Sequence, residues 1–183
     1  MKIGVYGSAE AVDEKIKKSA RIMGKEIAKK GHIVVTGAGT GIPYEAVMGA
    51  AEAGGKCIGF SPAINLENHK KSGLPTKGFS KFVFIPKAYK RAKNLGVCKK
   101  YRNVSSVAEV DATIFINGRI GTMNEFTIAY DLGKKIGILE GSGGITKEAI
   151  KVLLRDSAKK SRSEIIYDSD PVSLVEKLIK LGD

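Results

Sequence analysis

The sequence predicts an α/β fold, namely a doubly wound parallel sheet of about seven strands with helices on both faces. Strand-like and helix-like segments alternate along the whole chain, and this order is typical of parallel sheets that are covered on both faces. The segment 111–116 is a short apolar run followed at once by a glycine turn and a helix, as in a buried parallel strand. Right-handed crossovers between such strands favour the doubly wound arrangement.

The elements follow in order, each strand a short apolar run and each helix a longer stretch between turn residues. The strands are predicted at 2–6, 32–36, 56–60, 81–85, 111–116, 135–139 and 164–167. The helices are predicted near 12–30, 43–54, 90–109, 122–132, 146–159 and 171–181.

Length and composition favour one domain that covers residues 1–183 and has a full core. No apolar run approaches the roughly 20 residues that span a bilayer. The start of the chain resembles a strand rather than a signal peptide, because no apolar region with a cleavage site follows it. Cys57 and Cys98 fit neither a zinc spacing nor a disulfide framework, so core positions in a protein of the reducing cytoplasm are expected.

The formal net charge of +12 indicates anionic partners such as nucleotides, nucleic acid or cofactor phosphates. The competing explanation is a solvated basic helix surface, as in residues 14–18. His32 and His69 have no second ligand at metal spacing, so a helix-cap or surface position is expected for both and no metal site is expected. Ser8 has no evident His and Asp partners, so a hydrolase triad is not supported.

The segment 117–125 is the most informative part of the chain. Its sequence is Asn117-Gly118-Arg119-Ile120-Gly121-Thr122-Met123-Asn124-Glu125, and a helix is expected to begin near Thr122 and to end near Gly133. Glycines allow the backbone to approach a ligand closely, and a helix start supplies free N–H donors for an anion, most often phosphate. A capping box, with Thr122 as the cap and Glu125 bonded back to it, explains the same residues equally well.

Three loops follow predicted strands and therefore meet at the carboxyl edge of the sheet, where ligands bind in such folds. The first contains Gly7 and Ser8, the second contains Gly37, Gly39, Thr40 and Gly41, and the third is the segment that contains Asn117, Gly118, Arg119, Gly121 and Thr122. The second loop lacks both the dinucleotide fingerprint and the Lys-Ser/Thr of a P-loop. Its glycines suit either a turn or a ligand wall, and their density favours the wall.

Two further segments bear on the site. Arg102 lies on the helix that precedes the fifth strand, where its guanidinium suits either a phosphate or Glu125. Lys99 and Lys100 are more consistent with a solvated helix start. Residues 61–80 form a long irregular segment at the end of the third strand, and it either folds over the ligand or is a disordered surface loop.

These residues resemble the LOG family of cytokinin-activating phosphoribohydrolases, long labelled possible lysine decarboxylases. The resemblance runs from Lys2 to about Leu139 and includes the segments 5–8, 37–41, 46–51 and 121–125. Arg102-Asn103 stands where the family has Arg-Lys, and Gly121-Thr122-Met123-Asn124-Glu125 matches its Gly-Thr-x-x-Glu.

The resemblance implies a Rossmann-like homodimer that cleaves the N-glycosidic bond of nucleoside 5′-monophosphates without a cofactor. It implies that the Gly-Thr helix start holds the phosphate and that Arg102 and Glu125 are catalytic. A carboxylate beside an oxocarbenium-like state suits this chemistry, since it stabilises the charge while a water attacks.

The sequence departs from the family pattern in the ligand loop. Asn117-Gly118-Arg119 replaces the family's Pro-Gly-Gly, and Asn103 replaces its lysine. Arg119 either binds an extra phosphate or blocks the family substrate. Such changes resemble a side branch of the family that contains molybdenum cofactor carrier proteins, which bind a phosphorylated ligand.

The hypothesis from the sequence is therefore a cytoplasmic LOG-like protein that binds a phosphorylated nucleotide-like small molecule. N-glycosidic hydrolysis is the expected activity, and a non-catalytic nucleotide or molybdenum cofactor carrier is the alternative. We expect a homodimer or higher homo-oligomer and no membrane partner. Single-stranded DNA, which a related fold binds, is a less favoured partner because few aromatic residues lie in the basic stretch 87–102.

Overall fold

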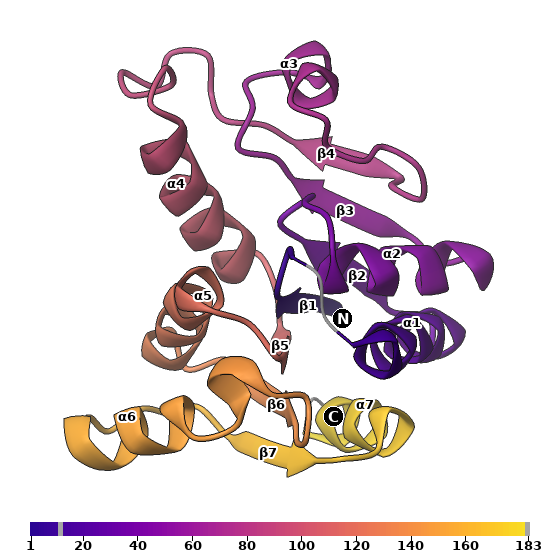
Figure 1. Ribbon diagram of the computed structural model, residues 1–183, viewed down its shortest axis with the longest axis vertical. Helices are drawn as coiled ribbons and strands as arrows, with labels where there is room; N and C mark the ends of the chain where they lie inside the picture. Colours follow the sequence, from indigo (N-terminus) through magenta and orange to yellow (C-terminus); the bar gives the residue numbers. More distant parts are fainter. Residues whose placement is uncertain (11–12, 182–183) are drawn as a thin grey trace.

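The computed structural model describes residues 1–10 and 13–181 and shows a Rossmann-like α/β fold. Seven parallel strands form one sheet, as predicted, and the structure gives their order as β4-β3-β2-β1-β5-β6-β7 (Figure 1). The strands are β1 (Lys2–Gly7), β2 (Ile33–Thr36), β3 (Cys57–Phe60), β4 (Lys81–Val83), β5 (Ala112–Ile116), β6 (Lys135–Leu139) and β7 (Ile165–Asp168). The helices are α1 (Glu14–Lys29), α2 (Ile42–Glu52), α3 (Leu66–Lys71), α4 (Leu95–Ala108), α5 (Ile120–Asp131), α6 (Ala149–Ser157) and α7 (Pro171–Lys180), with a short 3-10 turn η1 (Gly144–Thr146).

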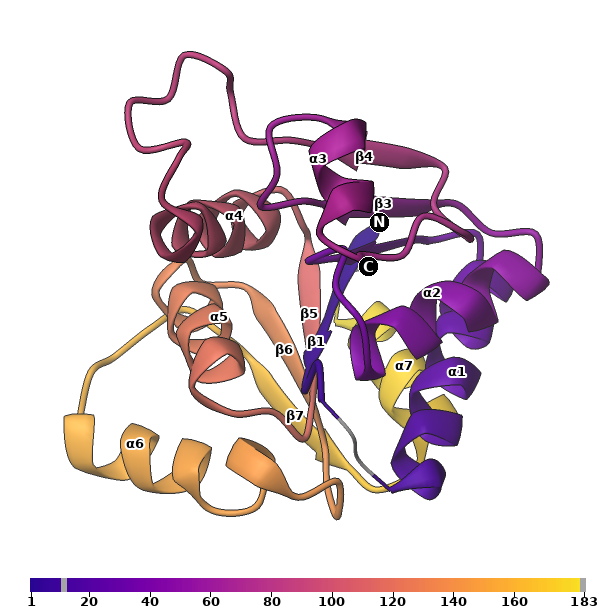
Figure 2. The ribbon, with the colours of Figure 1, turned by 45° about the horizontal axis from the view of Figure 1, so that its top comes forward.

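Apolar side chains of the central strands alternate between two cores. Val5 and Ile114 pack with α1, α2 and α7 on one face, whereas Tyr6 and Phe115 pack with α4, α5 and α6 on the other. Figure 2 shows these two helix layers on opposite sides of the sheet. Both faces of the central strands are thus buried, which explains why the predicted strands are nearly uninterrupted apolar runs.

The chain reverses its direction across the sheet between β1 and β5. From β1 it moves outward to β4, and it then returns so that β5 pairs with the other side of β1, with Gly7 opposite Ile116. The turns after adjacent strands therefore diverge here, and such a switch point is where open α/β sheets bind ligands. A side chain at position 7 would collide with the Ile116 carbonyl and with Ile42, so the close approach of the two loops requires glycine.

Some element boundaries differ from the prediction. Helix α4 begins at Leu95 rather than near 90, because Asn94 caps it by accepting a hydrogen bond from the Val97 amide at 3.1 Å. The segment 61–80 is neither irregular throughout nor a disordered loop, since it contains α3 with Asn65 as its cap. No helix in the described part of the chain is long and apolar enough to cross a membrane.

Candidate ligand site at the carboxyl edge of the sheet

A cavity of about 460 Å³ opens at the carboxyl edge of the sheet, beside the switch point. We call it the first cavity. Residues from all three loops predicted from the sequence, and from α4, line this cavity. The predicted site residues that line it are Gly7, Ser8, Gly37, Gly39, Thr40, Arg102, Arg119, Gly121, Thr122 and Glu125.

Three other predicted site residues do not line this cavity, and each has a role in the backbone. Gly41 has a φ of 72° and approaches the Ser8 carbonyl, so it shapes the turn before α2. Asn117 donates two hydrogen bonds to Ser142, one from its backbone amide to the hydroxyl oxygen and one from its side-chain Nδ2 to the carbonyl. The Gly118 amide donates to Asn117 Oδ1 at 2.6 Å, and its carbonyl accepts from the Ile145 amide at 3.0 Å.

The start of α5 faces the first cavity without a side-chain cap. The helix begins at Ile120, after Arg119, so Thr122 and Glu125 both lie inside its first turns. The proposed Thr122–Glu125 capping box is therefore wrong, because the helix starts two residues earlier than the sequence pattern indicates. No acceptor within the described residues is seen for the amides of Ile120, Gly121 and Thr122. These amides and the positive end of the helix dipole suit an anion.

Arg102 reaches the first cavity from the middle of α4. Its Nη1 donates a hydrogen bond to the Gly37 carbonyl at 2.7 Å. A side chain at position 37 would collide with this guanidinium, so glycine at this position makes room for it. The Arg102 Nε is buried and has no hydrogen-bond partner among the described residues. The second loop is therefore a wall of the cavity as well as a turn.

Glu125 is the buried acid of the site, and 6% of its surface is exposed. Burial raises its pKa from 4.5 to about 7, while the nearby charges of Arg102 and Lys100 act in the opposite direction. No hydrogen bond to its carboxylate is seen among the described residues. A carboxyl group with a pKa near neutrality is suited to donating or accepting a proton at physiological pH.

Among the lining residues that were not in the predicted site, Tyr6 and Asn103 are polar and buried. Tyr6 is buried at the end of β1, and its hydroxyl lies near Ser106 without a hydrogen bond of good geometry. Burial raises the pKa of this hydroxyl far above its usual range. Asn103 donates to Asn124 Oδ1 at 2.9 Å, and its own Oδ1 has no partner in the described structure. Both signals are tertiary, since neither a strand tyrosine nor a helix asparagine is conspicuous in the sequence.

The segment 61–80 contributes a wall of the first cavity through Pro62 and Leu74. His69 holds this segment together from inside, so the expected cap or surface position for it is wrong. Its ring is fully buried, with Nδ1 at 2.9 Å from the Ser61 hydroxyl and Nε2 at 3.0 Å from the Pro75 carbonyl. The α3 helix places the imidazole under the segment rather than in solvent.

Both cysteines are buried and unpaired, as expected for core positions. Within residues 1–10 and 13–181, no cluster of three or more His, Cys, Asp or Glu side chains is placed to hold a metal ion. The charged groups of the site include the carboxyl groups of Glu10 and Glu125 and the guanidinium groups of Arg102 and Arg119, and the amides at the start of α5 lie beside them.

The fold and this site define a Rossmann-like protein with a polar cavity at the switch point of its sheet. The chain belongs to the SLOG cluster4 family, whose family model matches residues 1–175. The resemblance to LOG-type proteins inferred from the residues is thereby confirmed.

Three known proteins illustrate the relationship. An uncharacterized protein of Archaeoglobus fulgidus is 31% identical over 140 residues, which are 76% of this chain and 80% of that protein. The solved structure of the protein TM1055 is 25% identical and covers 98% of both chains with a TM-score of 0.78. The molybdenum cofactor binding protein of Rippkaea orientalis is 20% identical and covers 100% of this chain and 97% of its own, with a TM-score of 0.76.

The same fold also occurs in a DNA-binding protein. DNA processing protein A from Helicobacter pylori, which binds single-stranded DNA, is 18% identical and has a TM-score of 0.65. The match covers 98% of this chain and 80% of that chain. At this level of identity, the likeness extends to the fold alone.

Proposed function

We propose that this protein binds a phosphorylated nucleotide-like ligand in the first cavity and hydrolyses the N-glycosidic bond of a nucleoside 5′-monophosphate. One observation carries the proposal: the uncapped start of α5, Arg102 and Glu125 all face the same cavity. The amides of α5 and Arg119 suit the phosphate, and the buried Glu125 lies one helical turn further along α5.

Glu125 has the properties that the hydrolytic step needs. Cleavage of an N-glycosidic bond builds positive charge on the ribose, and a carboxylate close to the ring stabilises it while a water attacks the anomeric carbon. The departing base takes up a proton, and a group with a pKa of about 7 exchanges protons readily near neutral pH. Arg102 lies close enough to favour the ionised form of Glu125, so it tunes this equilibrium.

A panel of nucleoside 5′-monophosphates tests the proposal. The purified protein is incubated with each nucleotide, and free base is measured by chromatography. We expect release of base from at least one nucleotide and loss of that release in Glu125→Gln, with nucleotide affinity retained in calorimetry. Absence of base from every nucleotide in the panel would overturn the hydrolase proposal.

The second candidate function is a carrier of a nucleotide or of molybdenum cofactor. It is supported by the fold shared with the Rippkaea orientalis protein and by Asn103, which provides no positive charge beside Glu125. If calorimetry shows tight nucleotide or pterin binding while no base is released, the carrier function takes the place of hydrolysis.

We also propose that the protein is a cytoplasmic homodimer. Helices α4 and α5, which line the first cavity, expose the apolar side chains of Val104 (51% exposed) and Ile120 (80% exposed). Light scattering coupled to size-exclusion chromatography measures the mass directly, and Ile120→Asp should shift a dimer toward the monomer. A monomeric wild-type protein would contradict this assembly.

A further inference from the structure

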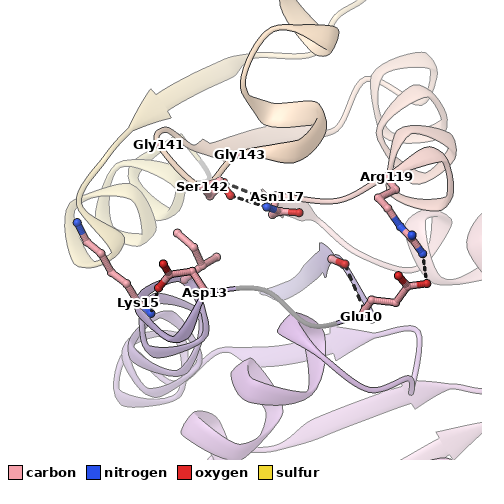
Figure 3. A pocket seen from close by; sticks show the side chains of 10 residues that line it. Glu10, Asp13, Lys15, Asn117, Arg119, Gly141, Ser142 and Gly143 are labelled. Atoms are coloured by element: carbon pink, nitrogen blue, oxygen red, sulfur yellow. Dashed lines mark hydrogen bonds and ion pairs between the residues drawn. The ribbon is translucent and has the colours of Figure 1, made fainter.

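A second cavity of about 590 Å³ lies on the other side of Arg119. The proposed function makes no use of it. It is an open cavity bordered by the ends of β1, β5 and β6 and by the start of α1, with Ser8, Lys15, Asn117 and Ser142 among its lining residues. Figure 3 shows Arg119 and Glu10 facing each other at one side of this cavity and Asp13 and Lys15 at the other.

The wall between β5 and β6 is held in place by several hydrogen bonds. The Asn117 amide donates to the Ser142 hydroxyl oxygen at 2.8 Å, and Asn117 Nδ2 donates to the Ser142 carbonyl at 2.6 Å. Ser142 Oγ in turn donates to the Leu139 carbonyl at 2.7 Å. These bonds hold Asn117 at a φ of 57°, an uncommon conformation for a residue other than glycine. The hydrogen bonds therefore fix this one wall of the second cavity.

The charged side chains that line the second cavity differ in whether they have a partner. Asp13 accepts a hydrogen bond from the Lys15 amide at 2.7 Å as the cap of α1, and Glu10 forms an ion pair with Arg119. In the part of the chain that the structure describes, no ion pair or hydrogen bond engages the Lys15 ammonium group. The lining carries the carboxylates of Glu10 and Asp13 as well as the cations of Lys15 and Arg119, so it is suited to a polar group rather than to an apolar one.

The two cavities meet at the Arg119–Glu10 ion pair. Ser8, Glu10 and Arg119 line both of them. The side chains of Arg119 and Glu10 are 65% and 64% exposed, and ion pairs at such exposure contribute little to stability. A phosphate that binds Arg119 through the planar guanidinium can therefore replace the Glu10 carboxylate at small cost.

We propose that the two cavities form one continuous groove, and that its ligand is a nucleotide extended beyond its 5′-phosphate by a second phosphate and a polar group. The nucleoside part lies in the first cavity, the diphosphate lies at Arg119 and the start of α5, and the distal polar group lies beside Lys15 and Ser142. This inference rests on the proposed nucleotide site and narrows its ligands to diphosphate-linked nucleotide conjugates.

Calorimetry with AMP, ADP and ADP-ribose tests the groove. We expect ADP-ribose to bind the wild-type protein about tenfold or more tightly than AMP, as one added charge-assisted contact provides. Lys15→Ala should remove most of this gain and leave AMP affinity unchanged. Lys18→Ala, which removes an exposed lysine of α1 that does not line the cavity, is the matched control and should keep the gain.

A third variant tests the junction. Glu10→Gln removes the carboxylate that competes for Arg119, so it should raise the affinity for both ADP and ADP-ribose. Equal affinities of AMP and ADP-ribose for the wild-type protein, or a full gain in Lys15→Ala, would overturn the extended groove and leave the nucleotide site standing. Failure of all three ligands, and of their guanine counterparts, to bind would overturn the nucleotide site as well.

Discussion

Glu125 is an acid in an environment that disfavours its charge. Its carboxyl group is buried beneath the first cavity, and Arg102 and Lys100 compensate only in part, so its pKa is about 7. The folded state therefore carries a free-energy penalty whenever this group is ionised. Catalytic carboxyl groups commonly carry such a penalty, because a carboxyl group exposed to water would not hold a proton near neutral pH.

This penalty should make the free energy of unfolding depend on pH. In the unfolded chain the carboxyl group titrates near 4.5 and in the folded chain near 7. Its contribution to stability is therefore fully present below the lower value and is lost as the pH rises through the upper value. We expect Glu125→Gln to be more stable than the wild type above about pH 8, by at most about 3 kcal/mol, and to lose this advantage below about pH 5.

Urea unfolding of the two proteins at both pH values measures the difference. Glu10→Gln, at an exposed position, is the control and should show no comparable dependence on pH. A stability difference between Glu125→Gln and wild type that is the same at both pH values would mean that burial does not shift this carboxyl group. The expected effect of Glu125→Gln on stability comes from burial of the carboxyl group and not from the capping role that the sequence indicates, because Glu125 lies inside α5.

Arg119 is the residue that most distinguishes the ligand loop from the family pattern. It is exposed at the mouth of both cavities, within reach of the α5 start. Arg119→Ala should weaken nucleotide monophosphate binding by about 1–3 kcal/mol, the range for a hydrogen bond with a charged partner. Calorimetry measures the loss, and Arg91→Ala controls for the change in net charge. An unchanged affinity would remove Arg119 from the site.

At the scale of elements, the second loop and α4 depend on each other. The Arg102 side chain crosses from α4 to the Gly37 carbonyl, and the space it fills is the space that a side chain at position 37 would occupy. The loop therefore selects the position of the guanidinium, and the guanidinium supports the loop. The hydrogen bond thus joins the loop after β2 to helix α4.

Gly37→Ala should displace Arg102 and weaken ligand binding, with a loss of stability of about 1–3 kcal/mol from overpacking. Gly39→Ala is the matched control for stability in the same loop, because its added methyl group would meet open space. Thermal unfolding of both variants gives the comparison, and nucleotide titration of Gly37→Ala measures the loss of affinity. Equal thermal stability of the two variants would show that Arg102 moves aside without loss of stability.

At the scale of the whole molecule, the net charge of +12 attracts polyanions in general. Base stacking needs exposed aromatic rings along a basic groove, and the basic stretch 87–102 contains one aromatic pair, Tyr89 and Tyr101, whose ring centroids are 4.9 Å apart. Phe60 and Phe115, by contrast, are buried in strands. Charge without a stacking surface favours weak and unspecific binding to DNA.

We therefore expect single-stranded DNA to bind weakly and to dissociate as salt is added, because the attraction depends on the release of counterions. Fluorescence anisotropy of a labelled oligonucleotide at increasing salt measures this. Tyr101→Ala should change the affinity little. Submicromolar binding that persists at about 0.2 M salt would contradict an interaction based on charge alone and would favour DNA over the nucleotide as ligand.

The sequence determined the α/β class, the seven strands and the three loops that meet at the carboxyl edge. These follow from local patterns, since buried parallel strands are apolar on both faces and their turns require glycine. Loop chemistry also indicated several of the residues that line the first cavity, such as Gly37 and Arg119. Helix starts were less well determined, because the Thr-x-x-Glu spacing of a capping box occurs equally inside α5.

Tertiary structure decided what each of these residues does. Only packing places Tyr6 and Asn103 at the cavity and buries His69 under the segment 61–80. The raised pKa of Glu125 and the meeting of two cavities at Arg119 likewise arise from residues far apart in the chain. Burial and charge depend on neighbours that the fold brings together from different strands and helices, and no local pattern encodes them.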